Sequence, residues 1–287
     1  MGGKTRGGDG AGAAMAKTWF ITGTSRGFGR EWATAALERG DSVVATARDS
    51  STLGDLVERF GDRVLPLDLD VTDRSAVQPA VDAGVARFGR LDVVVNNAGY
   101  GQFGMVEEVS EEEARAQMEV NLFGALWVTQ AVLPQLRAQG GGHVLQVSSI
   151  GGISAFRDVG IYNASKWALE GLSQALALEV ADFGVSVTIV EPGGFDTDWA
   201  GSSARRAQPI EAYEPVREAG RAARAARTSA PGDPRASAAA VLAVVDADEP
   251  PLRVFLGAAP LGIAEADYAS RLETWRAWQP VAERAGG

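Results

Sequence analysis

The sequence predicts an α/β fold in which helices cover both faces of a parallel sheet. Short apolar segments rich in β-branched residues alternate with longer segments of helical periodicity along most of the 287 residues. A glycine-rich turn follows the first such strand, at the place where parallel sheets commonly bind ligands. Because crossover connections are right-handed, we expect a doubly wound, Rossmann-type sheet with strand order 3-2-1-4-5-6-7.

The first half of the chain alternates strand and helix. "TWFIT" at 18–22 is apolar enough for a buried strand, and "REWATAALERG" at 30–40 has helical spacing that stops at Gly40. The same two patterns predict further strands at 42–47, 63–69 and 91–97. They predict helices at 52–60, at 73–89 and over about 111–138.

The second half continues the alternation and then changes character. "HVLQVSS" at 143–149 and "VSVTIVEP" at 185–192 predict strands on either side of a helix at 161–182. Residues 196–235 are rich in Ala, Arg, Ser and Pro and lack strand periodicity. A helix near 235–247 and a strand at 253–257 then return to the sheet, and 264–285 predicts a last amphipathic helix. We therefore expect one domain over 17–287, preceded by a flexible, glycine-rich tail at 1–16.

Composition excludes several classes of function. The net charge of −10 argues against a nucleic-acid surface, and the absence of cysteine excludes disulfides and thiolate chemistry. His143 is the single histidine, so a zinc site or a Ser-His-Asp triad is not expected. No apolar stretch approaches the roughly 20 residues that span a bilayer, and the first 16 residues do not form a signal peptide. These features predict a cytoplasmic protein.

Unusual residues collect where the predicted strands end. "TGTSRGFG" at 22–29, "NNAG" at 96–99, Ser149 and "PGGF" at 192–195 each follow a different strand. The carboxyl ends of parallel strands meet at one edge, so these segments are expected to lie together. Glycines in the first segment permit a tight turn and let backbone amides reach a pyrophosphate, although a glycine-rich turn alone is a weak signal.

The scarce amide residues point to the same edge. The chain has four asparagines, of which Asn96 and Asn97 end the fourth predicted strand and Asn163 adjoins Tyr162. Asn121 lies inside the long predicted helix, where asparagine is a poor helix former, and apolar neighbours place it toward the sheet. A buried asparagine that fixes the helix by hydrogen bonds is the alternative interpretation.

A tyrosine and a lysine stand one helical turn apart in "YNASK" at 162–166. Lysine is rare here: the other two, Lys4 and Lys17, lie near the amino terminus, whereas arginine is abundant. Spacing of i, i+4 places Tyr162 and Lys166 on the same helix face, where an ammonium would lower the pKa of the phenol. Arginine is bulkier, planar and always charged, so it is no substitute for a lysine in this position.

Taken in order, these segments resemble the short-chain dehydrogenase/reductase family, in its shorter single-domain branch. The resemblance covers about residues 18–200 and includes Ser149 thirteen residues before Tyr162. It implies an oxidoreductase that moves a hydride between a nicotinamide cofactor and a ketone, aldehyde or alcohol. It also implies a homodimer or homotetramer and a lid over the substrate at about 196–235.

By the same resemblance, four residues form the catalytic set. Tyr162 is the general acid in reduction and the general base in oxidation, and Ser149 hydrogen-bonds the substrate oxygen. Asn121 holds a water that relays protons to Lys166. The implied cofactor-binding residues are Gly23, Ser25, Arg26, Gly27, Phe28, Gly29, Arg48, Asp70, Val71, Asn97, Ala98, Gly99, Tyr162, Lys166, Pro192, Gly193, Phe195 and Thr197. No metal is implied.

The second predicted strand favours NADP(H) over NAD(H). An acidic residue commonly ends this strand and binds the ribose 2′-hydroxyl, but here Ala47 takes its place and Arg48 follows. Arg48 and Arg26 could together bind a 2′-phosphate, because guanidinium groups pair well with phosphate. Asp49 weakens this argument, and both arginines could instead be solvated surface residues.

The substrate is less well specified. Tyr100, Phe103 and Trp199 would give an apolar lining suited to a ketone or secondary alcohol, unless these aromatics only pack the core. Arg217, Arg221, Arg224 and Arg227 would form one basic stripe, either a solvated lid face or a dock for an anionic substrate carrier. A non-catalytic NADP-binding regulator is the alternative function, and an epimerase of the longer branch is disfavoured because it needs a larger carboxyl-terminal domain.

Overall fold

The computed structural model describes residues 16–197, 199, 201, 203–225 and 230–286. A seven-stranded parallel sheet, in spatial order β3-β2-β1-β4-β6-β7-β9, forms its centre. In chain order these strands are β1 (Thr18–Thr22), β2 (Ser42–Ala47), β3 (Val64–Asp68), β4 (Val93–Asn96), β6 (Gly142–Val147), β7 (Val185–Pro192) and β9 (Arg253–Leu256). Counting only these seven, the order is 3-2-1-4-5-6-7, so the predicted fold class is confirmed.

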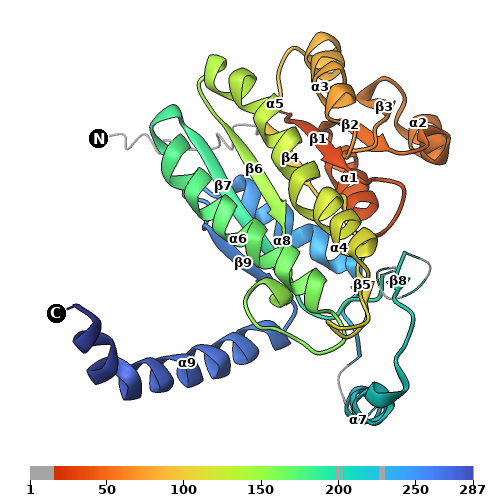
Figure 1. Ribbon diagram of the computed structural model, residues 1–287. Coiled ribbons are helices and arrows are strands. Elements are labelled where there is room, and N and C mark those ends of the chain that lie inside the picture. The colour runs from red at the N-terminus through yellow and green to blue at the C-terminus, as the bar shows by residue number, and fades with distance from the viewer. Residues whose placement is uncertain (1–15, 198, 200, 202, 226–229, 287) are drawn as a thin grey trace, which may run out of the picture.

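Helices cover both faces of the sheet (Figure 1). One apolar layer joins the sheet to α1 (Gly27–Glu38), α2 (Gly54–Phe60) and α8 (Pro234–Asp246), with Trp19 and Trp32 fully buried in it. The opposite layer joins the sheet to α3 (Arg74–Phe88), α5 (Ala125–Ala138) and α6 (Gly160–Val180). Successive side chains of a strand point to opposite faces, so Trp19 and Phe20 enter different layers.

The long predicted helix is continuous but not regular. It consists of α4 (Glu111–Met118), a π-helical segment at Glu119–Gly124 and α5. Ser110 begins it with a capping box, in which its hydroxyl accepts from the backbone N–H of Glu113 while the Glu113 carboxylate accepts from the backbone N–H of Ser110. Single-turn π segments often mark functional sites, and this one contains Asn121.

Capping differs between the helices. Asp73 caps α3 and Asp233 caps α8, each accepting a hydrogen bond from a backbone N–H two residues later. Helix α1 begins at Gly27, three residues earlier than predicted, and its N-cap residue Arg26 makes no side-chain capping bond. The first backbone amides of α1 therefore have no side-chain cap from Arg26 and no acidic residue in the first turn.

The segment that follows β7 is held to the loop after β4. The two-residue strands β5 (Gln102–Phe103) and β8 (Arg205–Arg206) pair in parallel. They were not predicted, because two residues carry no periodicity. Beyond β8, Arg217 on α7 (Glu214–Ala225) forms an ion pair of 2.5 Å with the buried Glu108.

Arg217 and Arg221 both form ion pairs with Glu214. Two of the four arginines of the predicted basic stripe are therefore paired with acidic residues of the chain itself. Of the other two, the Arg224 side chain and all of Arg227 lie outside the described residues, as do most of the residues of the predicted tail at 1–16.

The last helix, α9 (Ala259–Glu283), extends away from the body of the protein (Figure 1). Its first turns pack on β9, whereas Trp275 and Trp278 are exposed. Short 3-10 turns occur at Ser50–Leu53, Gly61–Arg63, Ile150–Gly152, Ala181–Phe183, Glu211–Tyr213 and Arg284–Gly286. Within the described residues, none of the helices combines the length and apolarity needed to cross a membrane.

Candidate active site

The turn between β1 and α1 has the backbone geometry that its glycines predict. Gly23 and Gly27 adopt φ of +71° and +60°, which other residues rarely do. A Cβ atom at Gly29 would lie 2.4 Å from the carbonyl oxygen of Gly23, so no side chain fits there. Ser25 and Arg26 are exposed between them. The turn thus brings backbone amides to the surface at the start of a helix.

Asn97 supports this turn from the neighbouring strand. Its side-chain N–H groups donate to the carbonyl oxygens of Thr22 and Gly23 at 2.8 and 3.0 Å. The hydroxyl oxygen of Thr22 in turn accepts from the backbone N–H groups of Asn97 and Ala98, both at 3.0 Å. Thr22 was missed by sequence analysis, although it directly precedes the first glycine of the motif. Asn97 and Ala98 therefore adjoin the glycine turn, as predicted.

Asn121 joins the loop after β4 to helix α6. Its side-chain oxygen accepts from the backbone N–H of Tyr100 at 3.1 Å, and its amide donates to the Tyr100 carbonyl and to the Ser165 hydroxyl. A Cβ atom at Gly99 would lie 3.1 Å from the Asn121 oxygen and 3.7 Å from Lys166 Nζ. The structure therefore brings together three predicted residues, Asn121, Gly99 and Lys166. Ser165, which also contacts Asn121, was not predicted from the sequence.

Ser149, Tyr162 and Lys166 converge beyond the carboxyl ends of β4 and β6. The Ser149 hydroxyl accepts from the backbone N–H of Gly151 at 3.0 Å, and it is also hydrogen-bonded to the Tyr162 phenol. Lys166 Nζ lies 5.9 Å from the centre of the Tyr162 ring and donates to the carbonyl of Val147 at 2.7 Å. Both Tyr162 and Lys166 are buried.

Burial controls the protonation of this pair. It raises the pKa of the Tyr162 phenol to about 12, against a lowering effect of the hydrogen bond with Ser149. It lowers the pKa of the Lys166 ammonium to about 8, against a raising effect of the Glu170 carboxylate one turn later. The expectation that the pKa of Tyr162 lies below its ordinary value is wrong for this structure, because desolvation of the buried phenol outweighs the hydrogen bond with Ser149. At pH 7 the phenol is a proton donor.

The end of β2 presents Arg48 to solvent beside the glycine turn. Asp49 accepts from the backbone N–H of Ser51 at 3.0 Å and thereby caps the following turn. In the loop after β3, the exposed Asp70 carboxylate accepts from the backbone N–H and the hydroxyl of Thr72. Val71, next to it, is buried against Gly124, where a Cβ atom would lie 2.6 Å from Val71 Cγ2. Asp70 therefore stands at the predicted edge and Val71 packs inward.

The loop after β7 returns to the glycine turn through aromatic contacts. The Phe195 ring lies 5.0 Å from that of Phe28, edge to face, and Phe28 stacks on Trp32. Pro192 is buried and the backbone N–H of Gly193 donates to the carbonyl of Leu256. Thr197 follows, its hydroxyl accepting from the backbone N–H of Trp199. The side chains of Phe28 and Phe195 thus pack on each other, which closes the glycine turn from one side.

Trp199 packs on the Tyr162 ring and joins it to a second aromatic residue. The Trp199 ring is 4.9 Å from the Tyr162 ring and 5.0 Å from the Phe103 ring. The Arg205 guanidinium lies 4.7 Å from the centre of the Tyr100 ring. The indole N–H of Trp199 is buried without a hydrogen-bond partner among the described residues. Burial raises the pKa of the Tyr100 phenol, against a lowering effect of the charge and hydrogen bond of Arg205. This wall is apolar but offers one unpaired polar group.

Comparison with known proteins agrees with the fold and the motifs. A family model described as short chain dehydrogenase matches residues 17–208. An oxidoreductase of Botryotinia fuckeliana, BOA17, is 45% identical over 269 residues, 91% of this chain and 97% of that protein. A short-chain dehydrogenase of Streptomyces avermitilis shares the structure with a TM-score of 0.86 and 40% identity, over 95% of this chain and 99% of that one. The chain belongs to the short-chain dehydrogenase/reductase family.

Relatives of this family were solved with either nicotinamide cofactor. An alcohol dehydrogenase of Thermococcus sibiricus, complexed with 5-hydroxy-NADP, is 30% identical with a TM-score of 0.70, over 84% of this chain and 96% of that one. A family member from Burkholderia phymatum, in complex with NAD, is 25% identical with a TM-score of 0.75, over 87% and 92%. The protein is therefore a dehydrogenase/reductase, and family membership alone does not decide between the cofactors.

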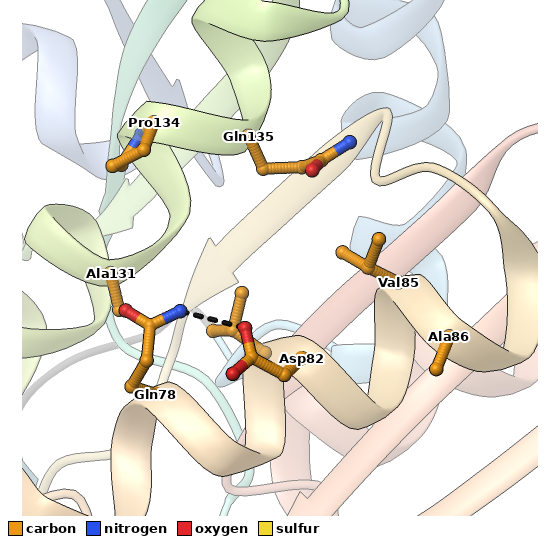
Figure 2. A pocket seen from close by; sticks show the side chains of 8 residues that line it. Gln78, Asp82, Val85, Ala86, Ala131, Pro134 and Gln135 are labelled. Carbon is orange, nitrogen blue, oxygen red and sulfur yellow. Dashed lines mark hydrogen bonds between the residues drawn. The ribbon is translucent and has the colours of Figure 1, made fainter.

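The remaining features lie away from this short-chain dehydrogenase/reductase site. A groove of about 490 Å³ separates α3 from α5, and Figure 2 shows its lining, in which the Asp82 carboxylate accepts a hydrogen bond from Gln78. His143 lies at the amino end of β6, opposite to Ser149, and its Nε2 is 2.9 Å from the Thr188 hydroxyl. Among the described residues no three His, Cys, Asp or Glu side chains gather as a metal site.

Proposed function

We propose that this protein interconverts a ketone or aldehyde and an alcohol with NADP(H), using Tyr162 as the proton donor and acceptor. The observation that carries the proposal is the convergence of the Tyr162 phenol, the Ser149 hydroxyl and the Lys166 ammonium beside Gly99. A buried phenol with a raised pKa, next to a second hydroxyl and a cation, is suited to protonating a carbonyl oxygen.

The glycine turn fits a dinucleotide. The positive φ of Gly27 and the first amides of α1, which lack a side-chain cap, form the anion-binding arrangement that a pyrophosphate needs. Asn97 holds the turn in shape, Lys166 would reach the nicotinamide ribose, and Thr197 would meet the carboxamide. When bound, the nicotinamide supplies or accepts the hydride.

Each catalytic side chain then has a distinct task. Ser149 would turn its hydroxyl proton from the Tyr162 phenol to the substrate oxygen, while the backbone N–H of Gly151 holds the hydroxyl in position. Tyr162 donates its proton to that oxygen in reduction, and the Lys166 ammonium, still charged at pH 7, stabilises the phenolate that results. Both side-chain N–H groups of Asn121 are engaged with Tyr100 and Ser165, so the side chain would hold the relaying water only through the second lone pair of its oxygen.

Replacement of the catalytic pair tests this assignment. Tyr162→Phe removes the donor with little change in volume, so cofactor binding should persist while kcat falls by at least roughly 10²–10⁴-fold. Lys166→Arg should also be strongly impaired, because a planar guanidinium does not restore the ammonium geometry. Tyr213→Phe, which loses one exposed hydrogen bond to Glu107, is the matched control and should keep its activity. Normal turnover by Tyr162→Phe would refute the mechanism.

The preference for NADP(H) rests on the end of β2. Arg48 is exposed there, and Asp49 caps the next turn, so its carboxylate is engaged away from the ribose site. We expect Arg48→Asp to lower the ratio of kcat/KM for NADPH over NADH, since it removes a phosphate partner and adds a repelling charge. Arg276→Asp on α9 introduces the same charge change far from β2 and should leave the ratio unchanged. An unchanged ratio in Arg48→Asp would exclude contact with the 2′-phosphate.

We propose a largely apolar substrate with a second oxygen besides the reacting carbonyl. Phe103 and Trp199 provide the apolar wall, and the unpaired Trp199 N–H would bond the second oxygen. Ketones of equal size with and without a hydroxyl or ester group provide the test, and equal kcat/KM for both would remove the polar requirement. The homodimer or homotetramer and the cytoplasmic location stay predictions, for which light scattering and cell fractionation are the measurements.

A further inference from the structure

A buried acidic residue lies one helical turn beyond Lys166. Glu170 on α6 is 6% exposed, and Lys166 is buried to the same extent. Residues four apart on a helix face the same side, with Cβ atoms about 5–6 Å from each other. The Lys166 ammonium donates to the carbonyl of Val147, the last residue of β6. The ammonium and the Glu170 carboxylate therefore share one side of α6, inside the protein.

Groups from three other segments surround the Glu170 carboxylate. The guanidinium of Arg253 on β9 lies between it and Glu191 of β7, with Nε 3.2 Å from Glu170 and 3.4 Å from Glu191. A Cβ atom at Gly152 would lie 2.6 Å from the hydroxyl oxygen of Ser148 and 3.2 Å from Glu170 Oε1. The hydroxyl and the carboxylate thus border the same small space. The position of Glu170 is therefore fixed by the ends of three neighbouring strands.

The surrounding groups determine which carboxyl carries the charge. Burial, reinforced by the charge of Glu170, raises the pKa of Glu191 to about 8. Burial also raises the pKa of Glu170, against the hydrogen bonds of Ser148, Arg253 and Glu191 and the charge of Arg253. At pH 7 the pair therefore shares one proton, which Glu191 holds, and Glu170 is the anion. Glu265 on α9, which lines the cleft beside Glu191, is exposed to solvent.

We propose that Glu170 is a positioning residue for the proposed reduction and keeps the Lys166 ammonium charged at neutral pH. The inference rests on the proposed role of Lys166, since a neutral amine could not stabilise the Tyr162 phenolate. Burial lowers the pKa of Lys166 to about 8, and the charge of Glu170 opposes this. The phenol of Tyr162, which also faces Lys166, has its pKa raised to about 12 and supplies no negative charge at pH 7. Glu170 acts through Lys166 and does not itself touch the substrate.

Urea unfolding of the cofactor-free protein between pH 6 and 10 tests the inference without any turnover. The advantage in unfolding free energy of Lys166→Met over its parent falls as pH rises through the folded pKa of Lys166. In a Glu170→Gln background this fall should begin at least about half a pH unit lower, because the anion that favours the ammonium is gone. A second background adds Glu191→Gln, so that Glu191 cannot ionise in place of Glu170, and should show the same shift. An unchanged onset in this second background would overturn the proposal.

Ketone reduction at pH 6 and 9 tests the consequence for turnover. In Glu170→Gln the ratio of kcat/KM at pH 9 to that at pH 6 should fall at least about threefold, the change in charged fraction that half a pKa unit gives above the pKa. Glu170→Asp keeps the charge, so its ratio should stay close to that of the parent. Glu179→Gln removes the same charge at an exposed position of α6 and is the matched control.

A merely structural role would give a different pattern. Glu170→Gln would then lower kcat/KM by the same factor at both pH values, and Glu170→Asp would be impaired in the same way. That result would overturn the proposal. Absence of ketone reduction in the parent would refute the proposed function instead, and the unfolding measurements would still decide whether Glu170 keeps Lys166 charged.

Discussion

Lys166 is expected to lower the free energy of unfolding of the protein, and its proposed catalytic role would be the reason that it is kept. Burial lowers the pKa of its ammonium from the ordinary value of 10.5 to about 8. Since the unfolded chain binds this proton more tightly, the charged lysine destabilises the folded state at pH 7. We predict that Lys166→Met abolishes turnover and raises the free energy of unfolding.

The pKa difference sets the size of the effect and its pH window. At pH 7 the penalty is about 3.4 kcal/mol, because each pKa unit corresponds to about 1.4 kcal/mol. It is relieved as pH rises from about 8 toward 10.5, where the folded protein has lost the proton and the unfolded chain has not. By pH 9.5 about 1.4 kcal/mol remains, so the advantage of the variant should shrink by about 2 kcal/mol. Lys166→Met also loses the hydrogen bond to Val147, which lowers its gain in unfolding free energy by about 1–3 kcal/mol at both pH values.

Urea unfolding of the cofactor-free proteins at pH 7 and 9.5 measures this change. The quantity is the difference in unfolding free energy between Lys166→Met and the parent, so titrations common to both cancel. Tyr162→Phe is the matched control: with a folded pKa of about 12, its difference from the parent should change by only about 0.2 kcal/mol over this interval. A Lys166→Met difference that is the same at both pH values would refute the lowered pKa.

Three further predictions concern other parts of the chain. Burial lowers the pKa of His143 to about 4, so the parent should lose about 2.5 kcal/mol more than His143→Gln between pH 7 and 4.5, measured by urea unfolding. Gly29→Ala should weaken NADPH binding at least tenfold in a fluorescence titration, because its methyl group would lie 2.4 Å from a backbone oxygen; unchanged binding would contradict the tight turn. Glu108→Gln, which removes the buried partner of Arg217, should speed proteolysis within 203–225, whereas Glu107→Gln should not.

The sequence determined the fold and most of the proposed site, because both depend on local pattern. Alternating strand and helix patterns predicted the sheet order, and residues placed directly after strands had to meet at its carboxyl edge. Gly27, Asn97 and Ser149 were found in this way, and Lys166 was found from the scarcity of lysine and its i, i+4 spacing from Tyr162. Thr22 and Ser165 were missed, although both adjoin the recognised motifs, because a lone hydroxyl residue has no distinguishing spacing.

Only the tertiary structure decided the electrostatics and the long-range contacts. The pKa values of Tyr162 and Lys166 follow from burial, which depends on what packs around a helix rather than on residues along it. The ion pair between Arg217 and Glu108 and the pairing of β5 with β8 join segments about a hundred residues apart. The sharing of Arg253 by Glu170 and Glu191 likewise depends on three elements that meet only in the folded chain. Periodicity indicates which face of a helix or strand is buried, but it contains no information on which charged side chains of other elements lie against that face.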